Sequence, residues 1–152
     1  MTSLAQADDV ELLSFRLADQ EYCLEVTSVR EIRGWTRATP LPHAPAHVQG
    51  VINLRGTVLP VIDLSLRLGM APIAPTERSV IIVVQDRGSS LGLLVDAVSD
   101  ILSIPSDALQ PPPAMADDRT TGFIQALTLV DGDLVRILNL SAVTLGAKAA
   151  SG

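Results

Sequence analysis

Residues 50–64 read Gly50-Val51-Ile52-Asn53-Leu54-Arg55-Gly56-Thr57-Val58-Leu59-Pro60-Val61-Ile62-Asp63-Leu64 and hold the most informative pattern in the chain. Two short aliphatic runs flank Arg55-Gly56, which predicts a β-hairpin over Gly50–Leu54 and Thr57–Ile62. Pro60 inside the second run predicts an edge strand or a bulge, because proline cannot donate a hydrogen bond to a neighbouring strand. Asp63 as N-cap and Gly69 as the residue after the last turn predict a short helix over Asp63–Leu68.

Three similar hairpins are predicted on either side of this one. Each is a pair of strand-length aliphatic runs separated by turn residues. They are expected at Leu12–Leu17 with Tyr22–Val26 around Asp19-Gln20, at Val80–Gln85 with Leu91–Val95 around Asp86-Arg87-Gly88, and at Ile124–Val130 with Leu134–Leu140 around Asp131-Gly132. Short helices are also predicted over Thr27–Ile32 and Asp96–Leu102. The chain is therefore expected to be mostly β, with short connecting helices.

An internal repeat relates the two halves of the chain. Tyr22–Ile32 and Leu91–Ile101 align at a shift of 69 residues, with the identical pairs Leu24/Leu93, Val26/Val95, Val29/Val98 and Ile32/Ile101. Gly56–Leu64 and Gly132–Leu140 align at a shift of 76. Because both segments keep their order, a true repeat is a better explanation than chance similarity between aliphatic strands. Copies over about 12–69 and 79–145 predict two small five-stranded barrels.

Composition narrows the class of protein. The 152 residues have the length of one domain, and 47% of them are hydrophobic. The single cysteine, Cys23, excludes a disulfide scaffold, and no apolar run has the roughly 18 residues of a membrane-spanning helix. A net charge of −6 and scattered basic residues argue against binding to nucleic acid or to anionic membranes. The early acidic residues Asp8, Asp9 and Glu11 predict no secretory signal.

The chain carries no motif of catalysis or cofactor binding. It has no Gly-x-Ser-x-Gly elbow, Walker loop or dinucleotide fingerprint, so neither enzyme activity nor a cofactor is predicted. His43 and His47 are spaced for one helix face, but neighbouring prolines disfavour a helix there, and no metal site is predicted. Asp96 and Asp100 are read as a helix cap and a solvated charge, and an enzyme that uses them as an acid–base pair stays open as an alternative.

The remaining features favour a protein-binding module. Apolar and charged residues alternate along Val29–Gly34, and Arg55 is placed at the tip of a hairpin. A charged tip between aliphatic walls suits a protein–protein contact with a polar rim. Cys23 lies in a predicted strand and is expected to be a small core residue.

Three segments resemble the CheW family. They are Val29–Gly34, Gly50–Leu64 and Leu94–Leu102, and the resemblance runs over nearly the whole chain, with Ala97 at a position where the family commonly has glycine. It implies one domain over 11–145, built of two SH3-like five-stranded β-barrel lobes with short connecting helices and with strands partly exchanged between the lobes. Residues 1–10 and 146–152 are expected to be flexible tails, and Pro111–Thr121 a loop.

This resemblance implies a non-enzymatic cytoplasmic adaptor. Such proteins couple the helical signalling tips of methyl-accepting chemoreceptors to the regulatory domain of the histidine kinase CheA in membrane-attached receptor arrays. Other adaptor copies in array rings are further expected partners, whereas no nucleic acid, membrane insertion, metal or cofactor is implied. Two alternatives stay open: the same adaptor in a pilus-based or other non-flagellar pathway, and a structural interaction module without kinase coupling.

The resemblance also implies which residues bind. By position in the matched motifs, the family's receptor-facing groove falls on Val29, Glu31, Ile32, Gly92, Val98 and Ile101, and further receptor- or kinase-binding positions fall on Gly50, Arg55 and Gly122. Glu31 and Arg55 are expected to form an ion pair that bridges the two lobes.

Overall fold

The structure is a computed structural model that describes residues 9–112 and 121–145. Residues 1–8 and 146–152 of the expected tails, and residues 113–120 of the expected loop, lie outside the described residues. Asp9 and Val10 were expected in the first tail, but they belong to the first strand, where they pair with Pro105 and Ile104.

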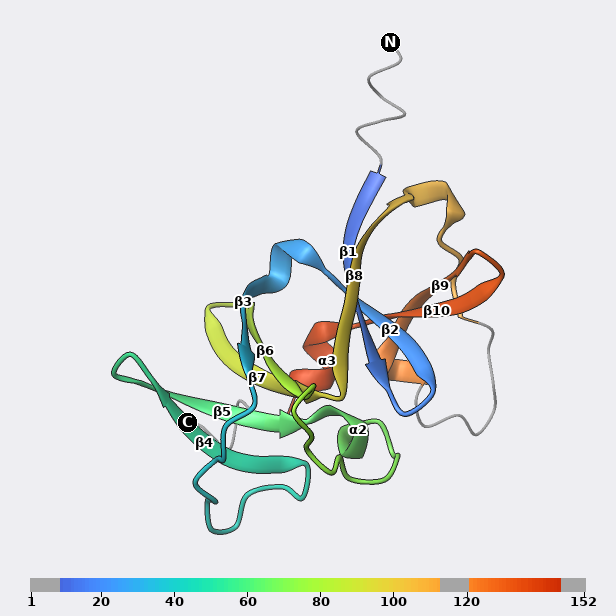
Figure 1. Cartoon of the computed structure of the whole chain (residues 1–152). Helices are drawn as coiled ribbons and strands as arrows, with labels where there is room; N and C mark the ends of the chain where they lie inside the picture. The colour runs from blue at the N-terminus through green and yellow to red at the C-terminus, as the bar shows by residue number, and fades with distance from the viewer. Residues whose placement is uncertain (1–8, 113–120, 146–152) are drawn as a thin grey trace.

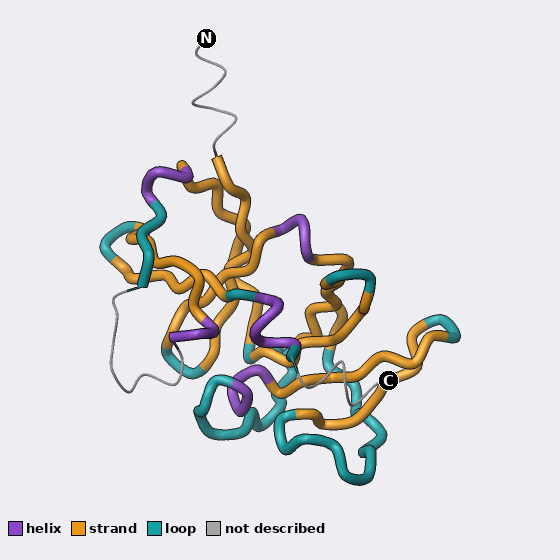
Figure 2. The backbone as a smooth tube through the Cα atoms, turned by 180° about the vertical axis from the view of Figure 1, so that it is seen from behind, coloured by secondary structure: helices purple, strands orange, loops and turns teal. Residues whose placement is uncertain are grey.

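Within the described residues, ten strands form two mostly antiparallel sheets, and the helices are short segments between them (Figures 1 and 2). The first sheet has the order β8-β1-β2-β10-β9 and the second β3-β6-β7-β5-β4. The strands are β1 (Asp9–Leu17), β2 (Gln20–Glu25), β3 (Val29–Gly34), β4 (Val48–Leu54), β5 (Thr57–Asp63), β6 (Val80–Asp86), β7 (Ser89–Val95), β8 (Ala97–Pro105), β9 (Ile124–Val130) and β10 (Asp133–Leu138). The helices are η1 (Val26–Ser28), α2 (Leu64–Arg67), η2 (Ser106–Ala108), η3 (Thr121–Phe123) and α3 (Leu140–Thr144).

The mostly-β prediction is confirmed, and the turn chemistry explains the hairpins. Both turn residues have positive φ at Arg55-Gly56 (50° and 86°), at Arg87-Gly88 (54° and 82°) and at Asp131-Gly132 (52° and 85°). This is the type I′ geometry, whose twist matches that of the flanking strands. Asp63 caps α2 as predicted, because its side chain accepts from the backbone N–H of Leu66 at 3.0 Å.

The edge-strand prediction for Pro60 is wrong, since β5 lies between β7 and β4. The parallel register of β5 with β7 begins only at Val61, so the missing N–H of Pro60 removes no hydrogen bond to that neighbour. A register shift does occur close by, in β4 between Val48 and Gly50.

Two of the predicted helices are strands. Thr27–Ile32 forms only the end of the one-turn η1 and then enters β3, and Asp96–Leu102 enters β8. In both segments the local cap and spacing signals were too weak to outweigh pairing with a distant strand. β3 pairs with β6, and β8 pairs along its full length with β1. The β-branched residues Val29, Ile32, Val98 and Ile101 suit these extended conformations.

Each sheet contains strands from both halves of the sequence. The first sheet combines β1 and β2 with β8, β9 and β10, whereas the second combines β6 and β7 with β3, β4 and β5. Matching β1 to β6, β2 to β7 and so on converts one strand order into the other. The two repeats are thus exchanged between the sheets after their second strands.

The predicted architecture of two five-stranded lobes with short connecting helices is confirmed, although the hydrogen-bonded sheets are open rather than closed barrels. β8 and β9 are the edges of the first sheet, and β3 and β4 are the edges of the second. The larger core cluster joins residues of both sheets, such as Phe15 and Leu24 of the first with Ile82 and Val84 of the second. A smaller cluster around Leu12 and Ile137 fills the first sheet alone. The shared core makes one body of the two lobes.

Candidate functional site

Four of the predicted binding residues lie on two edge strands, one from each sheet. Val29 and Ile32 belong to β3, and they pair with Val84 and Ile82 of β6. Paired residues point to the same face of a sheet, so Val29 and Ile32 share the face of these two core residues. Val29 is partly buried against the core that joins the sheets, whereas the side chain of Ile32 is 44% exposed.

The strand β8 repeats this arrangement on the other sheet. Val98 pairs with Phe15 and Ile101 with Leu13, and both partners belong to the same shared core. Val98 packs partly buried against that core, and Ile101 is 60% exposed. Each edge strand therefore has one half-buried valine and one exposed isoleucine on the same face of its sheet. This is the face whose side chains form the core shared by the two lobes.

We call Val29, Ile32, Val98 and Ile101 the two-strand face. Its exposed isoleucines are unusual, because large aliphatic side chains at a sheet edge invite association with other chains. The charged residues Glu31 and Asp100 lie among them and oppose simple strand addition. Each of these edges suits contact with an apolar helical surface.

Glu31 of β3 and Arg55 of the β4–β5 turn form an ion pair in the second sheet. Arg55 Nη2 lies 2.5 Å from Glu31 Oε1, and Arg33 Nη1 lies 3.2 Å from Glu31 Oε2. The expectation that the pair bridges the two lobes is wrong, because β3 and the β4–β5 turn belong to the same sheet. β3 and β4 are the two edges of that sheet, and a backbone bridge between Thr39 and Val51 already joins β4 to the segment after β3. The ion pair adds a side-chain link between the same two edges.

The electrostatics of this pair follow from its geometry. The guanidinium of Arg55, with that of Arg33 second, holds the pKa of Glu31 below its ordinary value. The carboxylate of Glu31 in turn raises the pKa of Arg55. Below them is a hollow of about 400 Å³, whose lining includes the apolar residues Leu54, Leu59 and Val83.

We expect the contribution of this pair to stability to depend on pH. A carboxyl whose pKa is lowered by folding stabilises the fold above its unfolded pKa, and this stabilisation is lost as the pH falls through the folded pKa. Glu31→Gln should therefore lower the urea midpoint at neutral pH, and the difference from the wild type should vanish in acid. Arg55→Gln should show the same pH dependence, and combining both changes should add little. A wild-type advantage that persists in strong acid would contradict this assignment.

Two of the predicted binding glycines are buried in the second sheet. A Cβ on Gly92 would lie 2.7 Å from Ile81 Cγ2, and a Cβ on Gly50 would lie 2.1 Å from the carbonyl oxygen of Thr39. A side chain at either position would therefore displace its neighbours in the second sheet, and the predicted binding role of these glycines stays a prediction. Gly122 is exposed in η3, where an added Cβ would meet no atom within 4 Å.

Two side chains in or next to the second sheet, Arg67 and Asp86, bind α3, and the sequence did not predict either contact. Arg67, in α2, donates to the carbonyl oxygens of Val143 at 2.9 Å, Ala142 at 3.0 Å and Leu145 at 3.2 Å. Its guanidinium also lies 4.8 Å from the ring centroid of Phe123. α3 follows β10 of the first sheet, and it lies at the centre of the molecule (Figure 1). Arg67 therefore fastens the two sheets together.

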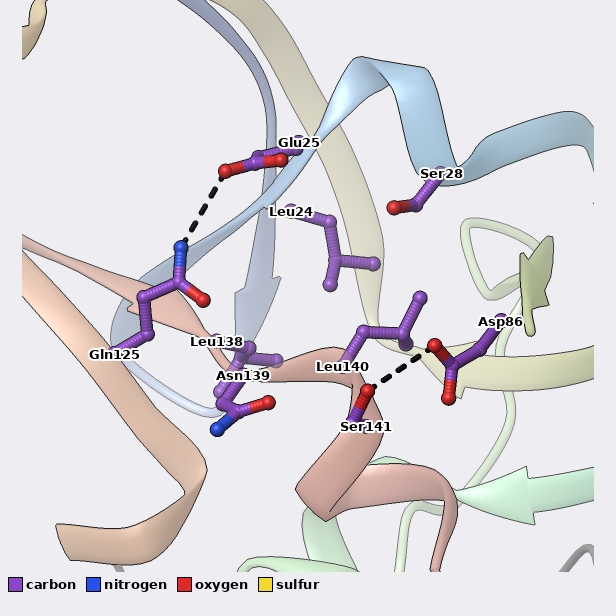
Figure 3. Close-up of a pocket in the computed structure, with 9 residues that line it drawn as sticks. All are labelled: Leu24, Glu25, Ser28, Asp86, Gln125, Leu138, Asn139, Leu140 and Ser141. Atoms are coloured by element: carbon purple, nitrogen blue, oxygen red, sulfur yellow. Dashed lines mark hydrogen bonds between the residues drawn. The ribbon is translucent and has the colours of Figure 1, made fainter.

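Asp86 at the end of β6 supplies the second fastening. Its carboxylate accepts from Ser141 Oγ at 3.1 Å (Figure 3). It also accepts from Thr144 Oγ1 at 3.2 Å. The same region forms a pocket of about 160 Å³ at the junction of β2, β6, β9 and α3, where Gln125 Nε2 also donates to Glu25. Asp86 lies 55 and 58 residues from Ser141 and Thr144 in the chain, so only the three-dimensional arrangement identifies these contacts.

A separate exposed apolar surface lies on the β9–β10 hairpin. Leu129 is 68% exposed and Leu134 is 44% exposed, on either side of the Asp131-Gly132 turn. These two residues face each other across the register of the hairpin. The signal was present in the sequence, because leucines next to a hairpin tip are far from the core.

The alternative catalytic and metal-binding residues do not come together. Asp96 accepts from the N–H of Ala18 at 2.7 Å and Asp100 from that of Ile101 at 2.8 Å, so they are not paired on a helix. Burial raises the pKa of the Cys23 thiol to about 12, which keeps it protonated and unreactive. Burial lowers the pKa of His47. Over residues 9–112 and 121–145, no three His, Cys, Asp or Glu side chains are grouped to hold a metal, and no helix has the length and hydropathy to cross a membrane.

Comparison with known proteins adds to this geometry. Residues 11–146 match the family model described as CheW-like domain. The chain is 52% identical to a probable chemotaxis protein CheW of Rhizobium etli, over 93% of this chain and 90% of that protein. It is 32% identical to protein FrzA of Myxococcus xanthus, over 91% of this chain and 87% of that protein.

A solved structure agrees with the fold. The crystal structure of the scaffolding protein TtCheW from Thermoanaerobacter tengcongensis has a TM-score of 0.83 and 32% sequence identity, covering 90% of this chain and 92% of that one. Sequence and fold thus match the same group of proteins over nearly the whole chain. The chain belongs to the CheW family of non-enzymatic chemotaxis scaffold proteins.

Proposed function

We propose that this protein is a cytoplasmic adaptor that couples chemoreceptors to the histidine kinase CheA. The two-strand face is the observation that carries the proposal. In this face, Ile32 and Ile101 lie on edge strands of different sheets. Each points to the side of its sheet that packs into the shared core. A receptor signalling tip is a helical hairpin, and an amphipathic helix that lies across both edges would bury both isoleucines.

The adaptor works by binding alone, because no chemistry is required of it. A helix that docks on the two-strand face contacts both lobes at once, so its binding responds to how the lobes are held together by Arg67 and Asp86. A receptor could bias the kinase only if its contacts with the adaptor differ between the active and inactive arrays. Multivalency in an array would strengthen contacts that are individually weak.

A coupling adaptor also needs a second surface for the kinase. We assign this role to Leu129 and Leu134 on the β9–β10 hairpin. β9 is the edge of the first sheet opposite to β8, so the hairpin leaves the two-strand face free. The β4–β5 hairpin, with Val58 64% exposed, projects from the other side of the molecule (Figure 1). Receptor and kinase would thus bind without competing for the same residues.

The experiment is a pair of NMR titrations of the labelled protein, with a receptor signalling-tip fragment and with the regulatory domain of CheA from the same organism. The tip should shift the amides of Val29, Ile32, Val98 and Ile101, and the kinase domain should shift those of β9 and β10. Ile101→Glu should weaken tip binding by about 30-fold or more, because it buries a charge against an apolar helix.

The matched control for that variant is Leu129→Glu, which introduces the same charge at a similarly exposed position on another edge. It should leave tip binding unchanged and weaken kinase binding. Loss of both partners in both variants, with folding intact, would refute two separate surfaces. Shifts with neither partner would refute the adaptor function and favour a structural module without kinase coupling.

The similarity to FrzA favours a second candidate pathway. FrzA is a relative whose name does not mark it as a chemotaxis protein CheW, and it matches this chain over most of its length. The same adaptor would then serve a non-flagellar array with a different receptor. Titration with tips of each receptor class from the same organism distinguishes the two, since only the cognate tip should shift the two-strand face.

A further inference from the structure

The two sheets of this acidic protein carry opposite charge. Residues 29–95, which contain all five strands of the second sheet and α2, hold seven arginines and four carboxylates. The described residues outside that range, 9–28, 96–112 and 121–145, hold ten carboxylates and two arginines. The net charge of −6 is therefore the sum of one basic lobe and one strongly acidic lobe.

The free positive charge of the second sheet gathers along β3. Two of its four carboxylates are occupied, because buried Asp63 caps α2 and Asp86 holds α3. Arg30 and Arg33 lie on β3 itself, Arg37 follows three residues after its end, and Arg55 reaches Glu31 from the facing hairpin. We call Arg30, Arg33, Arg37 and Arg55 the arginine edge.

The arginine edge holds more charge than its own carboxylate neutralises. Arg33 and Arg55 share the single carboxylate of Glu31, and Arg30 donates only to the neutral amide of Gln85. In the part of the chain that the structure describes, the side chain of Arg37 makes no hydrogen bond or ion pair. Arginines that are exposed and only partly paired remain available to a second set of carboxylates.

Apolar residues are interleaved with these arginines. Ile32 lies between Arg30 and Arg33, and Trp35, 39% exposed, lies between Arg33 and Arg37. The partner that complements this pattern is a helix with apolar residues on one face and carboxylates beside them. Charge complementarity of this kind governs which partner is accepted and how fast it associates more than the total affinity.

We infer that the arginine edge selects an acidic amphipathic helix as the occupant of β3. This inference rests on the proposed function, since it names the chemistry of the receptor segment that lies on the two-strand face. The acidic first lobe contributes to the same selection, because its charge disfavours carboxylates near β8 and leaves the apolar side of the helix to meet Ile101, while the carboxylates of the helix meet the arginine edge. A basic helix with the same apolar pattern is rejected at β3.

The test uses two synthetic helical peptides with the same apolar positions, one flanked by glutamates and the other by lysines. Trp35 is the single tryptophan of the chain and follows β3 directly, so its fluorescence reports occupancy of this edge. The acidic peptide should change the Trp35 emission and shift the amide of Arg37, and its affinity should fall steeply as salt is added. The basic peptide should do neither at β3.

Arg37→Glu should weaken the acidic peptide by about tenfold, because an exposed attraction becomes a repulsion. The matched control is Arg16→Glu, which makes the same charge change on the first sheet, where Arg16 is 49% exposed. Equal binding of the two peptides, binding of neither, or equal effects of Arg37→Glu and Arg16→Glu would overturn the inference. If the acidic peptide binds at β3 while the receptor tip binds nowhere, the inference holds and the proposed function fails.

Discussion

Gly50→Ala is expected to destabilise the protein by about 3 kcal/mol or more. Gly50 has a φ of +146°, a conformation that alanine rarely adopts, and its added Cβ would lie 2.1 Å from the carbonyl oxygen of Thr39. That oxygen accepts from the N–H of Val51, and the N–H of Thr39 donates to Val51 in return. The substitution would break this bridge and displace β4, which carries Arg55 at the end of its hairpin. Urea unfolding followed by Trp35 fluorescence measures the loss.

Gly56→Ala is the matched control for this prediction. Gly56 also has a positive φ, +86°, but an added Cβ there would meet no atom within 4 Å. It should cost only about 1 kcal/mol, which is the conformational penalty without the clash. Similar losses for the two variants would mean that the contact with Thr39 relaxes easily, and the expected role of Gly50 in holding β4 would be wrong.

Arg67→Ala is expected to destabilise the protein by roughly 3 kcal/mol and to free α3 from the second sheet. It leaves the three carbonyl oxygens of Val143, Ala142 and Leu145 without their donor and removes the cation from the face of Phe123. Because α3 follows β10, the loss should be felt between the lobes rather than within one sheet. Amide hydrogen exchange should therefore rise in α3 more than in β6 or β7.

Arg67→Lys separates charge from geometry at the same position. Lysine keeps the positive charge near the carbonyl end of α3, but its single ammonium cannot bond to three carbonyls in the plane of a guanidinium. Its stability should lie between those of the wild type and Arg67→Ala. If Arg67→Lys matches the wild type, the charge alone holds α3. Unchanged exchange in α3 for Arg67→Ala would show that Asp86 is sufficient.

The hairpins could be predicted from the sequence because their signals are local. Arg55-Gly56 and Asp131-Gly132 combine a glycine that accepts positive φ with flanking aliphatic runs, and both form type I′ turns. Asp63 could be recognised as a cap for the same reason, since its partner Leu66 is three residues away. In each case the residues that decide the structure are neighbours in the chain.

The errors lie where a distant strand decides. Ile32 and Ile101 were placed in short helices, but β6 and β1 draw their segments into sheet edges. The burial of Gly92 could not be predicted from the sequence either. The residues that surround it, Ile81, Val61 and Leu59, come from two other strands. The Glu31–Arg55 contact was anticipated from the family resemblance, yet its place within one sheet depends on the strand order, which no spacing of residues encodes.

The exchange of strands between the repeats makes the two lobes inseparable in folding. β1 and β2 leave their own half of the chain to join β8, β9 and β10, so the first sheet cannot be completed before β10 has been synthesised. The larger core, which contains residues of both sheets, including Leu138 of β10, depends on the same strands. The entropy of closing these long loops must be met before either core is whole, which favours one slow, all-or-none transition over two independent ones. Because each sheet contains strands of both repeats, deleting one repeat would leave neither sheet complete. The internal repeat is therefore held in place by the topology itself, while the surfaces of the two lobes remain free to diverge in charge.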